Sequence, residues 1–222
     1  MNFKFTELIK GILIIGSYFI LQIVLTIPFV FLLKETNTLY LFVFLGLAII
    51  YLTFYKDTLL DNLKDFKRNY KKILKTTIKY WIIGLGIMII SSSIISSFKI
   101  PTSINQDINV ELFKSGPIRQ SICAIILAPI IEELVFRNSF KKFTNNPMIF
   151  ALTTGLLFGL IHITSSINSA KDLIMLIHLI PYSAVGIAFG YAYKKNNDNI
   201  IGTMIVHGLH NTIAVLEILI LL

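Results

Sequence analysis

Long apolar segments separated by short polar connections fill almost the whole chain. Each segment has about the 17–25 residues with which an α-helix crosses a hydrocarbon core of ~30 Å. The pattern therefore predicts an all-α fold, a polytopic membrane bundle of about seven transmembrane helices. The predicted spans are residues 11–33, 38–55, 80–98, 119–140, 147–165, 172–193 and 199–220.

A basic, amphipathic segment follows the second span. From Leu59 to Thr77, apolar residues recur at helical spacing while lysines occupy the other faces. This combination is typical of a helix that lies on a membrane surface, where anionic lipid attracts it. We therefore expect a basic amphipathic helix on the cytoplasmic side.

The longest outer connection, residues 99–118, contains prolines that interrupt helices, Pro101 and Pro117. We expect this connection to be an ordinary loop. A lid that gates access of a substrate is the alternative.

The composition supports a membrane protein. Of the 222 residues, 55% are apolar and only 14% are charged, whereas a soluble domain carries about 25% charged residues. Little sequence remains outside the apolar segments, so residues 1–222 are expected to form a single integral membrane domain in the cell membrane, with lipid as a partner. The single cysteine, Cys123, excludes an internal disulfide and a cysteine-based zinc site.

The net charge of +8 is best explained by membrane topology. Of the 20 lysines and arginines, 14 fall in the connections on one side of the predicted bundle. Because cytoplasmic connections carry the excess of positive residues, the N-terminus is predicted to be cytoplasmic and, with seven spans, the C-terminus to be outside. No nucleic-acid partner is expected. The other side holds Lys34, Lys99, Lys114, Arg119 and Lys171.

Two adjacent glutamates lie inside the fourth predicted span. A carboxylate at bilayer depth costs roughly 2.5–3.5 kcal/mol, so Glu132 and Glu133 indicate pairing or chemistry. Glu133 and Arg137 are one turn apart on one helix face, which predicts a structural ion pair. Glu132 points about 100° away and is predicted to be a free carboxylate facing a cavity. Pro129 frees the carbonyl of Ile125 and can kink the helix just before the carboxylates.

Imidazole and amide groups lie in the last three spans. His162 follows Phe158 by one turn, and the phenyl ring is expected to form the floor of a site. His207 and Asn211 are four residues apart and can address one cavity, which suits metal binding or hydrogen bonding to an oxyanion. His178 is expected to be a helix-packing residue.

Together these groups supply a carboxylate base, two imidazoles and an amide donor from three different spans. Hydrolysis of a peptide bond needs this inventory, because water must lose a proton and the tetrahedral oxyanion must be stabilised. A second hypothesis is a non-catalytic membrane scaffold or immunity protein whose polar groups form a structural network. A third is a proton-coupled carrier, because intramembrane glutamate and histidine also build proton relays.

Three short motifs occur in order in the second half of the chain. They are Glu-Glu-x-x-x-Arg at 132–137, Phe-x-x-x-His at 158–162 and His-x-x-x-Asn at 207–211. They resemble the signature of the CPBP intramembrane metalloprotease family, also called Abi or the CAAX prenyl protease and bacteriocin-processing family. The resemblance covers about residues 119–215. It implies an intramembrane endopeptidase that acts on a membrane-associated peptide or protein, in bacteriocin self-immunity or in the maturation of peptide signals.

The resemblance also implies roles for individual residues. Glu132 would be the general base that activates water, with His162 assisting. His207 and Asn211 would hold the oxyanion, and the buried ion pair would orient the site.

Whether a metal takes part is left open. Two histidines and one glutamate match a catalytic zinc site with an open position, so Glu132, His162 and His207 are the candidate Zn²⁺ ligands. A metal-free mechanism needs the same residues. Counted from the cytoplasmic helix ends, Glu132 and His207 lie about 8 residues deep and His162 about 15, an offset of roughly 10 Å that helix tilt would have to close.

Overall fold

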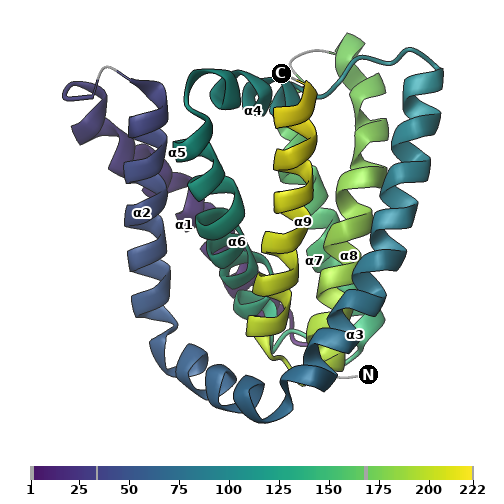
Figure 1. Ribbon diagram of the computed structural model, residues 1–222. Helices are drawn as coiled ribbons and strands as arrows, with labels where there is room; N and C mark the ends of the chain where they lie inside the picture. The colour runs from purple at the N-terminus through teal and green to yellow at the C-terminus, as the bar shows by residue number, and fades with distance from the viewer. Residues whose placement is uncertain (1–2, 34, 168–169, 222) are drawn as a thin grey trace.

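A computed structural model of the chain describes residues 3–33, 35–167 and 170–221, without the side chains of 170, 171 and 221. Over these residues the protein is an all-α bundle (Figure 1). The helices are α1 (Phe5–Val30), α2 (Thr36–Phe54), α3 (Lys56–Ser97), α4 (Ile104–Ser115), α5 (Pro117–Ile122), α6 (Ala128–Phe136), α7 (Pro147–Thr164), α8 (Leu179–Lys195) and α9 (Ile200–Leu221), with the π-helical turn η1 (Cys123–Leu127) and the 3-10 segments η2 (Asn138–Phe140) and η3 (Ala170–His178).

The predicted polytopic membrane fold is confirmed. Among the described residues, six helical segments are long and apolar enough to cross a membrane. The predicted fourth span is divided into α5, η1 and α6, which follow one another without a break from Pro117 to Phe136. At 1.5 Å per residue this rod is about 30 Å long, and it runs between the two ends of the bundle (Figure 1).

The sequence suggested a separate basic amphipathic helix, but the structure shows that this segment does not form a helix of its own. It is the first part of α3, a single helix of 42 residues that also contains the third span. The first part runs along one end of the bundle before the helix turns up along its side (Figure 1). The two parts are continuous because neither proline nor glycine occurs between Lys56 and Gly84 to end the helix.

The outer connection 99–118 is not an ordinary loop, because it contains α4. The side chain of Ser103 caps this helix by accepting a hydrogen bond from the backbone N–H of Gln106 at 3.3 Å. Gly116 ends α4, and Pro117 begins α5 at the first helical position, where its missing N–H has no cost.

The predicted sixth span begins as a 3-10 helix and becomes α-helical only at Leu179. His178, at the junction, is not buried in a helix–helix contact as expected. Its Nε2 lies 2.8 Å from the carbonyl oxygen of Pro101, so it joins η3 to the connection before α4.

Helices α7 and α8 pack closely because small residues face each other. A side chain at Gly155 would overlap the backbone of Ile187, and one at Gly159 would overlap Ser183. Gly186 of α8 meets the backbone of Gly155 in return. Such contacts between small residues let two membrane helices approach closely.

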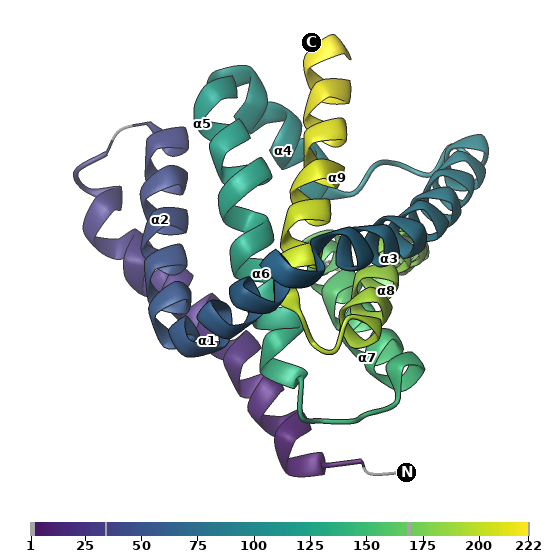
Figure 2. The same cartoon turned by 60° about the horizontal axis from the view of Figure 1, so that its bottom comes forward.

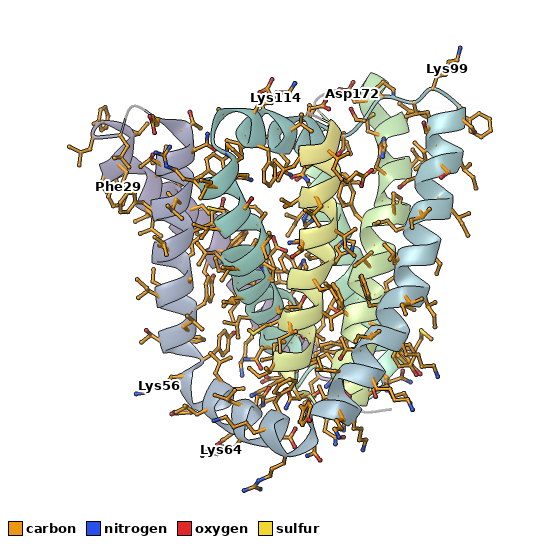
Figure 3. All side chains as sticks on the ribbon, viewed as in Figure 1. Phe29, Lys56, Lys64, Lys99, Lys114 and Asp172 are labelled. Atoms are coloured by element: carbon orange, nitrogen blue, oxygen red, sulfur yellow. The ribbon has the colours of Figure 1, made fainter. Side chains whose placement is uncertain are left out.

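Figure 3 shows which labelled lysines lie at each end of the bundle. Lys56 and Lys64 lie at one end and Lys99 and Lys114 at the other (Figure 3). The N- and C-termini also lie at opposite ends, as an odd number of crossings requires (Figure 1). Lys34 is outside the described residues and the side chain of Lys171 is not described, so two of the predicted outer cations are not placed.

Helices α6 and α9 occupy the middle of the molecule. Figure 2 shows them between the α1–α2 pair and the group formed by α3, α7 and α8. Both also contact each other directly. The glutamates of α6 and His207 of α9 therefore meet in the interior of the bundle.

Candidate active site

The fully buried ion pair of Glu133 and Arg137 anchors the site. Arg137 Nη1 lies 3.2 Å from Glu133 Oε1, and both side chains are 0% exposed. Arg137 Nη2 donates to the carbonyl oxygen of Gly186 on α8 at 3.1 Å, and the guanidinium lies over the Phe158 ring at 4.7 Å. The structure thus contains the predicted ion pair and ties it to α7 and α8.

His207 of α9 lies between the two glutamates of α6. Its Nδ1 is 3.0 Å from Glu133 Oε1, and its Nε2 is 3.6 Å from Glu132 Oε2. Because an ionised carboxylate only accepts hydrogen bonds, Nδ1 carries the proton that it donates to Glu133. Glu133 therefore fixes the orientation of the ring and points its Nε2 at Glu132.

Glu132 is the more accessible of the two carboxylates. Its side chain is 16% exposed, whereas that of Glu133 is 0% exposed. This difference fits the predicted division between a free carboxylate and a structural one. Neither of two pockets found among the described residues has Glu132 in its lining, so the cavity in front of it stays a prediction.

Phe158 connects the two imidazoles. The centroid of its ring is 4.4 Å from that of His162 and 5.9 Å from that of His207. With the guanidinium of Arg137 on the same ring, Phe158 forms a shared apolar surface beneath the polar groups. This position agrees with the predicted floor of the site.

His162 does not join the glutamates directly in this structure. It lies in the last turn of α7, and its Nδ1 donates to the carbonyl oxygen of Phe158 at 2.8 Å. Among the described residues, no hydrogen bond or ion pair joins His162 to Glu132 or His207. The Phe158 ring lies between the imidazoles of His162 and His207, and the depth offset expected from the sequence stays a prediction. In the neutral ring, Nε2 is left as an acceptor.

Asn211 reaches the backbone of the fourth span. Its Nδ2 donates to the carbonyl oxygen of Ala124 at 2.8 Å. In the π-helical register the N–H of Ala128 donates to Cys123, five residues back. The matching donor for Ala124 would be residue 129, a proline without an N–H. The carbonyl freed is therefore that of Ala124, one residue before the predicted Ile125, and Asn211 satisfies it.

Aromatic residues that were not anticipated from the sequence contact the histidines of α7 and α9, and Tyr182 and Trp81 are examples. Tyr182 of α8 stacks on His162 with ring centroids 5.2 Å apart, and its hydroxyl is 2.7 Å from Ser103 Oγ. Trp81 of α3 donates from Nε1 to His210 Nδ1 at 3.3 Å, so His210 joins α9 to α3. The sequence signal that could have identified Tyr182 and Trp81 is a hydroxyl or an N–H on an aromatic ring inside a predicted span, because such a buried polar group needs a hydrogen-bond partner.

The predicted zinc ligands do not gather into one group. Glu132 and His207 approach each other, but no three His, Cys, Asp or Glu side chains among the described residues are placed to hold a metal ion. His162 instead donates to the Phe158 carbonyl oxygen and stacks on Tyr182. We derive no step through a metal, and zinc binding stays a prediction.

The second half of the chain is similar to known proteins. Residues 114–213 match the family described as Type II CAAX prenyl endopeptidase Rce1-like. An uncharacterized protein of Mycoplasma capricolum is 26% identical over 166 residues, which are 70% of this chain and 47% of that protein. The chain thus spans about half the length of this curated relative. No solved structure matches it. All three motifs lie inside the matched residues, so the predicted resemblance to the CAAX protease family is confirmed over residues 114–213.

Proposed function

We propose that this chain is an intramembrane endopeptidase that hydrolyses a peptide bond in a membrane-associated peptide or protein. The observation that carries the proposal is the position of His207 between Glu132 and Glu133, with contacts of 3.6 and 3.0 Å. The match of the surrounding residues to a CAAX-type protease family supports the same conclusion. A base, an oriented imidazole and a buried counter-charge form one connected group there.

In the proposed reaction, Glu132 accepts a proton from water as the water oxygen bonds to the peptide carbonyl carbon. Negative charge then develops on the carbonyl oxygen. Protonated His207 donates a hydrogen bond from Nε2 to that oxygen, while Glu133 supports the positive charge of the ring. Glu132 returns its proton to the leaving nitrogen as the C–N bond breaks, so the proton count balances.

His162 and Asn211 take supporting roles in this proposal. The Nε2 of His162 would accept a hydrogen bond from the water on the side of the Phe158 ring. Asn211 would hold the π-helical turn in place through Ala124, and it becomes an oxyanion donor only when substrate displaces that contact. The biological context that we propose is bacteriocin self-immunity or the maturation of peptide signals.

The test is the variant Glu132→Gln, which keeps the side-chain shape and removes the base. The readout is mass spectrometry of peptide termini in membranes from cells expressing the wild type or the variant, which works for a substrate of any sequence. We expect termini that appear with the wild type to be absent with Glu132→Gln. The control is Glu217→Gln, at an exposed position near the C-terminal end of α9. This variant should leave the product termini unchanged.

A variant that inserts normally and yields the same termini as the wild type would refute the protease. It would favour the membrane scaffold instead. A scaffold is compatible with the internal pairing of Glu133, Arg137 and His207, because a purely structural network needs the same contacts.

A further inference from the structure

A polar pocket lies at the end of the bundle where Lys56 and Lys64 are found (Figure 3). Its volume is about 450 Å³. Four separate parts of the chain meet around it: the N-terminal segment, the start of α3, the connection before α7 and the turn between α8 and α9. The lining residues are Lys4, Thr58, Asn62, Lys141, Lys142, Asn145, Asn197 and Asp198. None of them belongs to the candidate active site.

The lining carries an excess of positive residues. Lys4, Lys141 and Lys142 contribute three amines, and no ion pair is found for them among the described residues. The one acid in the lining, Asp198, is already paired with Lys194 at 2.9 Å. The pocket therefore presents three amines to whatever enters it, and a further acid, Glu7, is paired with Lys10 while it also attracts Lys4 and Lys142.

Hydrogen bonds between the converging segments hold the pocket in shape. The backbone N–H of Lys4 donates to the carbonyl oxygen of Phe143 at 2.9 Å, which places the first lysine beside the other two. Lys141 Nζ donates to Thr58 Oγ1 at 3.3 Å, and Lys194 Nζ donates to the carbonyl oxygen of Lys141 at 2.7 Å. The cations are thus brought together before any ligand binds, so little ordering is needed on binding.

The location indicates a ligand from the membrane. The first part of α3, which supplies Thr58 and Asn62, runs along this end of the bundle (Figure 1). At the rim, Phe3 packs edge-on against Phe143 with ring centroids 4.9 Å apart, and Phe3 is 52% exposed. The pocket lies at an end of the bundle, and the phosphate groups of a leaflet lie at the ends of membrane-spanning helices.

We propose that this pocket binds the phosphate headgroup of an anionic phospholipid. Lysine amines and side-chain amides are the donors that a phosphodiester accepts, and basic pockets on one side of a membrane bundle suit such headgroups. A bound lipid would link the N-terminal segment, α3 and the α8–α9 turn. The proposal does not depend on the protease assignment.

The test uses the full-length protein purified in a neutral detergent. The probes are dioleoyl phosphatidylglycerol, dioleoyl phosphatidylcholine and sodium phosphate. Lipid retention by native mass spectrometry and the thermal unfolding midpoint are measured for each. We expect saturable retention and a higher midpoint with phosphatidylglycerol, and neither effect with phosphatidylcholine or with sodium phosphate at the same concentration.

The double variant Lys4→Gln/Lys142→Gln removes two amines from the pocket. With about 1 kcal/mol for each lysine near an anionic lipid, the affinity for phosphatidylglycerol should fall about thirtyfold. The matched control is Lys67→Gln/Lys71→Gln, which removes the same charge from exposed positions on α3 outside the pocket. This control should retain the affinity of the wild type within about twofold.

Three outcomes would overturn the proposal. Equal losses of phosphatidylglycerol affinity in the two double variants would mean that binding depends only on the total positive charge at this end of the bundle. Equal effects of phosphatidylcholine would remove the role of the negative charge. Protection by sodium phosphate as strong as that by phosphatidylglycerol would assign the pocket to a soluble phosphate compound.

Discussion

The buried charged side chains are tolerated inside the bundle because each of them has a partner of opposite charge or a hydrogen-bond partner in one small cluster. Glu133 is neutralised by Arg137, and His207 donates to the same carboxylate. The sequence could predict the first contact, because one-turn spacing fixes it. It could not predict that one imidazole serves both glutamates, because that depends on how α9 is rotated against α6. Nor could it place Asn211, whose partner depends on the π-helical turn.

At this scale, Arg137→Ala should lower the amount of protein in the membrane. Removing one partner of a buried pair leaves the other charge without compensation, at a cost of about 3–5 kcal/mol. Quantitative immunoblotting of isolated membranes measures the effect. Arg119→Ala is the control, because Arg119 forms an exposed ion pair with Glu35 that contributes about 0–1 kcal/mol. Equal abundance of Arg137→Ala and wild type would contradict a structural role for the pair.

The helices show which features of the sequence determine secondary structure. Apolar length predicted the spans, because it is set by the thickness of the membrane. The joins were harder to predict, since α3 continues through a change from polar to apolar sequence and α4 forms within a connection. The continuation of α3 depends on the absence of a helix breaker, and the formation of α4 depends on the Ser103 cap. Both are weaker sequence signals than hydrophobicity. The α7–α8 contact depends on glycines that hydropathy does not register.

Gly155→Ala should destabilise the contact between α7 and α8. The new methyl group would overlap the backbone nitrogen of Ile187, which cannot move away as a side chain can. We expect a loss of about 1–3 kcal/mol in the free energy of unfolding, seen as a lower thermal midpoint in detergent. Gly86→Ala is the control, because no atom lies within 4 Å of the added carbon. A midpoint as high for Gly155→Ala as for the control would contradict the close packing.

The arrangement of the whole molecule follows from the order of the crossings. Seven helical rods, with α5, η1 and α6 counted together, place the two termini at opposite ends (Figure 1). The same order brings α6 and α9 together in the middle, although more than 60 residues separate them in the sequence. Hydropathy predicted seven spans; among the described residues six are single helices long and apolar enough to cross a membrane, and the remaining one is divided into α5, η1 and α6. Hydropathy could not predict which helices are central, because neighbours in a bundle are chosen by side-chain packing.

The orientation of the bundle in the membrane is a prediction at this scale. The excess of positive residues places the end containing Lys56 and Lys64 in the cytoplasm. Alkaline phosphatase fused after α9 should therefore be active, and green fluorescent protein fused there should be dark. The opposite pair of signals would invert the assignment and place the basic pocket in the outer leaflet.

The central claim is that Glu132 and His207, from different helices, act on one water and one carbonyl group. The most direct measurement is a double-variant cycle, with Glu132→Gln, His207→Gln and their combination compared by the rate at which the product termini accumulate per folded protein. Each single variant should be slower by about 10²–10⁴-fold, and the combination should be no slower than the slower single variant, because either loss disables the same step. Losses that multiply in the combination would mean that the two residues act independently, and would contradict the account.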